Sequence, residues 1–299
     1  MNKLRDKKLG TLVGLAVGDA MGAPYEFLDK SKYTPTKEYN TGGAHNVSIG
    51  EWTDDTSMAL CLAQSLIDKN GFDPIDQMDK YLKWYLEGYM CTREKCFDIG
   101  NSTVKSIIDF EVNSTYYSNT TKINESGNGT IMRLAPIPML YSFDSDLKTY
   151  AKLSSKTTHS SFEASTCAEL LAGIINRCYL TMARDDKFLS KDNVLCCLED
   201  KTFLENAKQM KETIPSGYCI DTLEVAIRGF YNFDTFIDGL LYCISLGNDT
   251  DTVGAVYGQI AGAYYGLSGI PDYYKENLMQ YDKILDIANK LVDLAESNE

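Results

Sequence analysis

Residues 247–266 read GNDTDTVGAVYGQIAGAYYG, an acidic start followed by an apolar segment in which every fourth residue is glycine. The acidic start carries two carboxylates, Asp249 and Asp251, and the glycine series is Gly254, Gly258, Gly262 and Gly266. A spacing of four keeps these glycines close to one another along a helix. Each glycine inside a helix costs about 0.5–1 kcal/mol relative to alanine. We therefore expect another backbone to pack very closely against this helix, and a metal site at its acidic start.

A second glycine series lies near the N-terminus, where residues 4–21 predict a helix. Its members are Gly10, Gly14, Gly18 and Gly22. We predict that the two glycine-bearing helices pack on each other, or on common neighbours, at short range. A membrane-spanning pair of the G-x-x-x-G type is excluded, because the apolar run is short and charged residues precede it.

The composition indicates a globular protein and excludes several classes of partner. Apolar residues make up 44 % of the 299-residue chain, which is typical of a folded protein. The net charge of −13 argues against binding to nucleic acid or to an anionic membrane. The charged N-terminus runs into only about ten apolar residues, which fits neither a secretory signal nor a membrane span. The nine cysteines have no regular spacing, which favours reduced thiols in a cytoplasmic protein.

Hydrophobic periodicity predicts an all-α fold. Most segments fit a 3.6-residue period better than a 2-residue one, and no segment shows the clear alternation of a strand. Helices are expected at 4–21, from about 58 to 70, at 73–90, at 98–112 and in the tail at 273–295. Because no linker rich in proline, glycine or serine interrupts the chain, we predict a single domain over residues 1–299.

Two acidic motifs stand at predicted helix starts: Thr53-Asp54-Asp55 and Asp249-Thr250-Asp251-Thr252. Either motif alone could be an ordinary helix cap, but a cap needs one carboxylate and each motif supplies two. If the motifs meet, their like charges require neutralising cations. With only two histidines in the chain, such cations depend on oxygen ligands, which favours Mg²⁺, Mn²⁺ or Ca²⁺. An EF-hand is excluded, because Ile260 stands where its bidentate glutamate belongs.

Seven segments, in order along the chain, resemble the ADP-ribosylglycohydrolase family. They are GLAVGDAMGAPYEF (14–27), WTDDTSMAL (52–60), CFDIGN (96–101), GNGTIMRLAPIP (127–138), TTHSS (157–161), SGYCIDTLEVA (216–226) and LGNDTDTVGAVYGQIAGAYYG (246–266). The resemblance implies a compact all-α orthogonal multi-helix bundle, two divalent cations (Mg²⁺ or Mn²⁺) at one site, and hydrolysis of the glycosidic bond between ADP-ribose and an acceptor. The implied partners are an ADP-ribosylated protein as substrate and ADP-ribose as product.

The resemblance also implies the site residues, position by position. The implied metal ligands are Thr53, Asp54, Asp55, Asp249, Asp251 and Thr252. The implied catalytic residues are Glu26, on the loop over the metals, and the ligands Asp55 and Asp251. The implied substrate-binding residues are Asp98, Gly100, Asn101, Gly127, Asn128, Gly129, His159 and Tyr218. Residues 127–129 also suit this role on physical grounds. Glycines allow close backbone approach, and free N–H groups before a helix favour an anion such as a diphosphate.

The segments at 96–101, 127–138 and 216–226 look closest to arginine-specific members of the family. The expected activity is therefore release of ADP-ribose from arginine, through an N-glycosidic bond. Serine-linked ADP-ribose and O-acetyl-ADP-ribose are alternative substrates. A catalytically silent ADP-ribose-binding protein and a crystallin-like protein are the non-enzymatic alternatives. Arg133, just after the glycine loop, is expected to form a structural salt bridge rather than to hold phosphate.

Overall fold

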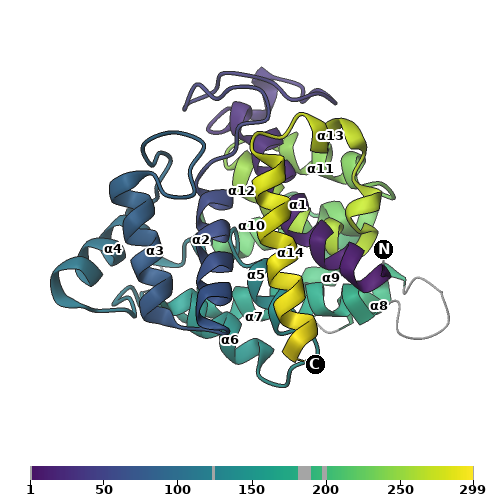
Figure 1. Ribbon diagram of the computed structural model, residues 1–299. Helices are drawn as coiled ribbons and strands as arrows, with labels where there is room; N and C mark the ends of the chain where they lie inside the picture. Colours follow the sequence, from purple (N-terminus) through teal and green to yellow (C-terminus); the bar gives the residue numbers. More distant parts are fainter. Residues whose placement is uncertain (1, 123–124, 181–189, 197–200, 299) are drawn as a thin grey trace.

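The computed structural model describes residues 2–122, 125–180, 190–196 and 201–298. The α-helices are α1 (Lys3–Gly22), α2 (Asp54–Lys69), α3 (Pro74–Glu87), α4 (Asn101–Asn113), α5 (Pro136–Leu140), α6 (Leu147–Lys156), α7 (Phe162–Leu180), α8 (Lys191–Leu195), α9 (Thr202–Lys208), α10 (Cys219–Asn232), α11 (Phe236–Ile244), α12 (Thr250–Tyr265), α13 (Asp272–Glu276) and α14 (Tyr281–Asn298) (Figure 1). Within the described ranges there is no β-sheet, only isolated bridges. The predicted all-α class is confirmed.

Helices α1 and α12 form the centre of the molecule, and no other described pair of helices is in such extensive contact. They run antiparallel and meet through their glycines, in the pairs Gly10–Gly262, Gly14–Gly258 and Gly18–Gly254. A Cβ added at Gly10 would lie 2.5 Å from the carbonyl oxygen of Gly262, which is closer than side-chain carbons approach. The predicted contact between the two glycine series is confirmed, and glycine is needed at these six positions because a backbone occupies the space of the side chain.

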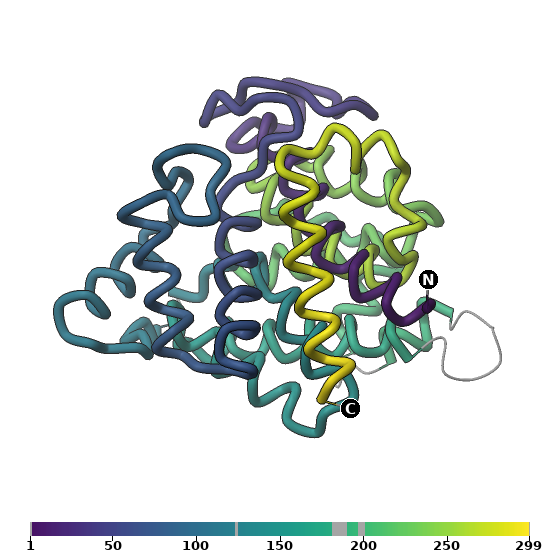
Figure 2. Tube along the Cα trace, in the orientation of Figure 1, coloured from purple at the N-terminus to yellow at the C-terminus, as the bar shows by residue number. Residues whose placement is uncertain are grey.

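The remaining helices surround this central pair. Helix α12 contacts α7, α10 and α11, and α1 contacts α14. Figure 2 shows the first helix of the chain, in purple, crossing the last helix, in yellow. Both central helices are buried along most of their length, α12 from Thr250 to Tyr264. Because these two helices are buried on all sides, their own apolar residues are distributed all around each helix instead of along one face. None of the described helices is long and apolar enough to cross a bilayer.

Several helix boundaries differ from the prediction: α2 begins at Asp54, about four residues early, and α3 ends at Glu87 instead of at residue 90. Helix α4 begins at Asn101 and not at Asp98, because Asp98 has a left-handed backbone (φ 62°) and Gly100 is extended. The tail, predicted as one helix over 273–295, is divided into α13 and α14, and Gln280 between them has φ 57°. The difference at α4 affects the site, since residues 98–100 form a loop before α4 and line a pocket there.

Candidate active site

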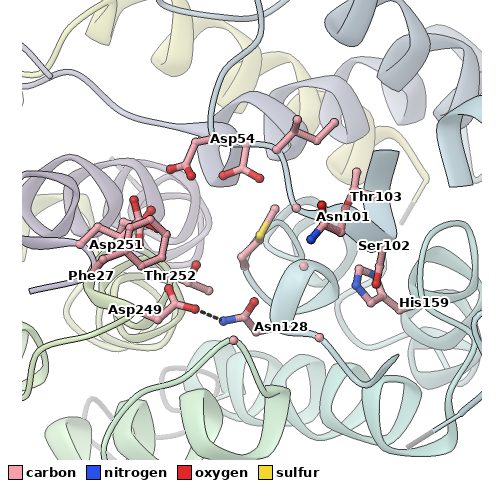
Figure 3. Close-up of a pocket in the computed structure, with 18 residues that line it drawn as sticks. Phe27, Asp54, Asn101, Ser102, Thr103, Asn128, His159, Asp249, Asp251 and Thr252 are labelled. Carbon is pink, nitrogen blue, oxygen red and sulfur yellow. Dashed lines mark hydrogen bonds between the residues drawn. The ribbon is translucent and has the colours of Figure 1, made fainter. Parts of the chain in front are cut away.

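A pocket of about 440 Å³ opens where the starts of α2 and α12 face the loops before α4, α5 and α10. Its lining consists of Glu26, Phe27, Asp54, residues 98–103, residues 127–129, Met132, His159, Gly217, Asp249, Asp251 and Thr252. In Figure 3 the side chains of Asp249 and Asp251 lie on one side of the pocket, opposite those of Asn101 and His159. Among the described residues that line it there is no lysine or arginine. The pocket is therefore acidic, and widely separated parts of the chain form it.

The two acidic motifs meet at this pocket. Asp54 and Asp55 lie in the first turn of α2, while Asp249 precedes α12 and Asp251 lies in its first turn. Asp249 has a non-helical backbone (φ −88°, ψ 73°), which lets both carboxylates of the second motif reach the pocket. The Thr252 hydroxyl donates to Asp55 Oδ1 at 3.4 Å, so the motifs are in direct contact. The sequence predicted two pairs of carboxylates at helix starts, and the fold brings the two pairs together.

Asp19, in α1, is a buried carboxylate beside this cluster that was not predicted from the sequence. It accepts hydrogen bonds from the backbone N–H groups of Thr53 (2.9 Å) and Thr56 (3.0 Å), and from both hydroxyls. These bonds cap the start of α2, whose N-cap Thr53 makes no side-chain capping bond of its own. The only sequence signal was a lone carboxylate within the apolar, glycine-rich part of α1.

Carboxylate oxygens in the cluster are left without protein partners. Among the described residues, Asp55 Oδ2 and Asp251 Oδ1 are buried and accept no hydrogen bond. One carboxylate oxygen from each of Asp19, Asp55 and Asp251 lies within 4.8 Å of the others. Buried carboxylate oxygens are costly unless a cation or a donor faces them, and hard divalent cations prefer such ligands. The residues present therefore fit a metal site.

Burial and crowding make these groups weak acids in the metal-free protein. The pKa values of Asp54, Asp55 and Asp251 are raised well above the usual range, first by burial and then by repulsion from neighbouring carboxylates. Burial raises the pKa of Asp19 to about 7, although its hydrogen bonds act in the opposite direction. A nearby cation lowers such pKa values, because it stabilises the charged form.

Glu26 lies at the edge of the pocket beside a histidine to which the sequence had assigned no role. Its pKa is raised to about 9, mainly by burial and then by repulsion from Asp98. His45 Nε2 lies 3.2 Å from Glu26 Oε2 and 2.9 Å from Asp98 Oδ1. Hydrogen bonding to Asp98 raises the pKa of His45. The three residues come from three separate segments, so no local pattern could have connected them.

The glycine loop at 127–129 forms another wall of the pocket. Asn128 Nδ2 donates to Asp249 Oδ2 at 2.8 Å and to Thr222 Oγ1 at 3.0 Å, which ties the loop to the acidic cluster. A Cβ on Gly127 or Gly129 would lie 2.8 Å from the ring of His159. These two positions are glycine because the imidazole packs directly against the loop.

Three of the predicted site residues do not line the pocket. Thr53 and Asp55 are fully buried behind its surface. Tyr218 lies outside it, where its backbone pairs with Gly127 in an isolated bridge. Burial and the nearby Glu163 raise the pKa of the Tyr218 hydroxyl. All the other predicted site residues line the pocket.

Arg133 is structural, but the expected salt bridge is not found among the described residues. Its guanidinium is buried and donates to neutral oxygens: the carbonyl of Gly129 at 2.6 Å and the hydroxyl of Thr158 at 2.7 Å. It also lies 5.0 Å from the centre of the Tyr81 ring. The expectation was wrong about the partner, because oxygens from the glycine loop and from the end of α6 converge on this side chain, where no described carboxylate does.

The helical fold and the pocket define a class: an all-α protein with a carboxylate-rich site that could hold divalent cations. The whole chain, residues 1–299, matches the model of the ADP-ribosylglycohydrolase family, and the chain belongs to that family. The resemblance stated from the sequence segments is confirmed.

The similar proteins span nearly the whole chain. The ADP-ribosylarginine hydrolase Tri1 of Serratia proteamaculans (strain 568) is 36 % identical over 97 % of this chain and 80 % of its own length. The ADP-ribosyl-[dinitrogen reductase] glycohydrolase of Rhodospirillum rubrum is 27 % identical over 92 % of this chain and 91 % of its own. A solved structure described as an ADP-ribosylglycohydrolase-related protein complex has a TM-score of 0.84 at 35 % identity, covering 99 % of this chain and 100 % of that chain.

Proposed function

We propose that this protein is a hydrolase, dependent on divalent cations, that removes ADP-ribose from arginine side chains of modified proteins. The observation that carries the proposal is the meeting of the motif Asp54-Asp55 with Asp249 and Asp251, with buried carboxylate oxygens left unpartnered. The arginine linkage is supported by the relative that is 36 % identical and is named for that activity.

In this proposal, two divalent cations, Mg²⁺ or Mn²⁺, would be held by the six predicted ligands: Thr53, Asp54, Asp55, Asp249, Asp251 and Thr252. When bound, the cations would supply positive charge that orients the hydroxyls of the ribose next to the scissile bond. Cleavage at an anomeric carbon develops positive charge on the sugar, which the surrounding carboxylates stabilise. Glu26 is the proposed acid–base group, because this carboxyl lines the pocket beside the acidic cluster, within reach of a bound sugar or water.

The rest of the ligand would lie along the opposite wall. Asp98, Gly100 and Asn101 would contact ribose, while the 127–129 loop and His159 would bind the diphosphate. Because the described lining has no lysine or arginine, the anion depends on backbone N–H groups, on neutral side-chain donors and on the cations.

The decisive experiment compares arginine-linked and serine-linked mono-ADP-ribosyl peptides as substrates, with Mg²⁺ or Mn²⁺, and measures free ADP-ribose. We expect release from the arginine peptide and loss of release with a chelator. Asp55→Asn and Asp251→Asn should each lower turnover by about 100-fold or more, because they remove metal ligands. Asp68→Asn is the matched control, since this exposed aspartate stands at the other end of α2.

The outcomes separate the alternatives. Release from the serine peptide alone would support the serine-linked alternative. Calorimetric binding of ADP-ribose without release from either peptide would indicate a binding protein. Undiminished turnover by both Asp→Asn variants in the presence of chelator would overturn the metal-site argument.

A further inference from the structure

A single hydroxyl joins His159 to a buried arginine. Thr158 Oγ1 lies 2.8 Å from His159 Nδ1, and Arg133 Nη2 donates to the same oxygen at 2.7 Å. All three side chains are buried. The arginine is held independently of the histidine, since it also donates to the Gly129 carbonyl at 2.6 Å and packs over the Tyr81 ring. Arg133 is therefore held in one orientation, in which it donates a hydrogen bond to the Thr158 hydroxyl.

The proton positions follow from counting donors and acceptors. A guanidinium only donates, so Arg133 occupies one lone pair of the Thr158 hydroxyl. Within the described chain, the other group at this hydroxyl is Nδ1 of His159, so the hydroxyl proton points there. Nδ1 then accepts, and the proton of a neutral imidazole must be on Nε2. The ring is neutral, since burial, followed by repulsion from Arg133, lowers the pKa of His159 to about 3.

The protonated nitrogen lies against the glycine loop that lines the pocket. A Cβ on Gly127 would lie 2.8 Å from His159 Nε2, so this nitrogen is on the side of the glycine loop. His159 lines the pocket, as Figure 3 shows, and among the described residues Nε2 has no hydrogen-bond partner. An N–H group here supplies a hydrogen-bond donor for an anionic ligand. Such donors are few, because the described lining holds several carboxylates and no cationic side chain.

We propose that Arg133 and Thr158 are positioning residues that hold His159 as the neutral tautomer with its proton on Nε2, so that the pocket offers this N–H to a ligand oxyanion. The opposite tautomer would present a lone pair to the anion and repel it. The identity of that anion as the diphosphate rests on the proposed function, but the tautomer does not.

Nitrogen-15 NMR of histidine-labelled, ligand-free protein tests the tautomer directly. The chain has only two histidines, and His45→Gln removes the signals of the other one. We expect His159 to show a protonated Nε2 and an unprotonated Nδ1, unchanged between about pH 5 and pH 8. Thr158→Val should allow the Nδ1-protonated form to appear, whereas Thr158→Ser should keep the wild-type spectrum. Thr157→Val is the matched control, because its hydroxyl also accepts from Arg133, at 3.3 Å, and makes no hydrogen bond to His159.

Calorimetry with ADP-ribose and Mg²⁺ tests the consequence for binding. Loss of one well-placed hydrogen bond should weaken binding to the Thr158→Val variant about tenfold. The Thr158→Ser and Thr157→Val variants should bind as the wild type does. A shifted tautomer with unchanged affinity would overturn the role in binding.

The wild-type spectrum is decisive by itself, even where Thr158→Val fails to fold. A protonated Nδ1 in the wild type would overturn the proposal. A wild type with the expected tautomer that binds no ADP-ribose would refute the proposed function while supporting the positioning of His159.

Discussion

Asp55 and Asp251 show at the scale of single residues why this site could hold cations. Each is buried, and each keeps one carboxylate oxygen that accepts no hydrogen bond from the described residues. The pKa of each is raised well above the usual range, first by burial and then by nearby carboxylates. In the absence of metal, the cluster avoids buried charge by retaining protons.

The metal-free protein should lose stability as the pH rises. A carboxyl group whose pKa is higher in the folded state holds its proton longer there, so stability falls between the unfolded and the folded pKa. For Asp19 this window runs from 3.8 to about 7, and for Glu26 it runs from 4.5 to about 9. We expect the Tm of chelator-treated protein to be lower at about pH 8 than at about pH 5.5.

The same measurement with Mn²⁺ or Mg²⁺ is the control. Cations bind the deprotonated form, so they should raise the Tm more at the higher pH and reduce the difference between the two conditions. Equal Tm values at both pH values without metal would contradict the assignment of these carboxyls as weak acids.

At the scale of elements, the α1–α12 contact both forms the core and positions residues of the acidic cluster. Helix α1 carries Asp19 and leads directly to Glu26, while α12 begins at the carboxylates Asp249 and Asp251. Close backbone contact along the glycines therefore sets how near these acidic groups lie. The glycine series and the acidic motif, which adjoin in sequence, serve the same site.

Replacing a central glycine by alanine should be strongly destabilising. At Gly14 the new methyl group would collide with the Gly258 carbonyl, and at Gly258 with the Gly14 carbonyl. We expect Gly14→Ala and Gly258→Ala each to lower the free energy of unfolding by about 1–3 kcal/mol or more. Chemical denaturation in urea measures this loss, and the affinity for Mn²⁺ should fall with it.

Gly173 of α7 is the matched control for this experiment. A Cβ at Gly173 would meet nothing within 4 Å, so Gly173→Ala removes only the helix penalty of glycine. We expect the free energy of unfolding to rise by about 0.5–1 kcal/mol. Similar losses for all three variants would show that close packing of α1 on α12 is not the reason for the glycines.

At the scale of the whole molecule, the chain is proposed to unfold as one domain. The first helix, α1, contacts α12 and α14 from the other end of the chain. The two tryptophans, Trp52 and Trp84, are fully buried. Because the core is shared between distant parts of the chain, loss of helix and exposure of tryptophan should coincide in denaturant. Circular dichroism and tryptophan fluorescence with separate midpoints would contradict a single cooperative unit.

Local patterns in the sequence were enough for the all-α class, the glycine series and both acidic motifs. The 3.6-residue period and the spacing of four depend only on helix geometry, so they can be read without knowing the fold. Helix ends were predicted less accurately. Helix α4 begins three residues later than predicted, because the loop conformation of Asp98 depends on the residues packed around it.

Contacts between distant segments were decided only by the tertiary structure. Asp19 caps α2 from α1, His45 contacts both Glu26 and Asp98, and Arg133 reaches His159 through Thr158. None of these pairings follows a period or a fixed spacing. The sequence by itself determined which chemical groups were available for the site. Packing decided which of them share a buried space, and in that space desolvation shifts their pKa values and hydrogen bonds fix their protons.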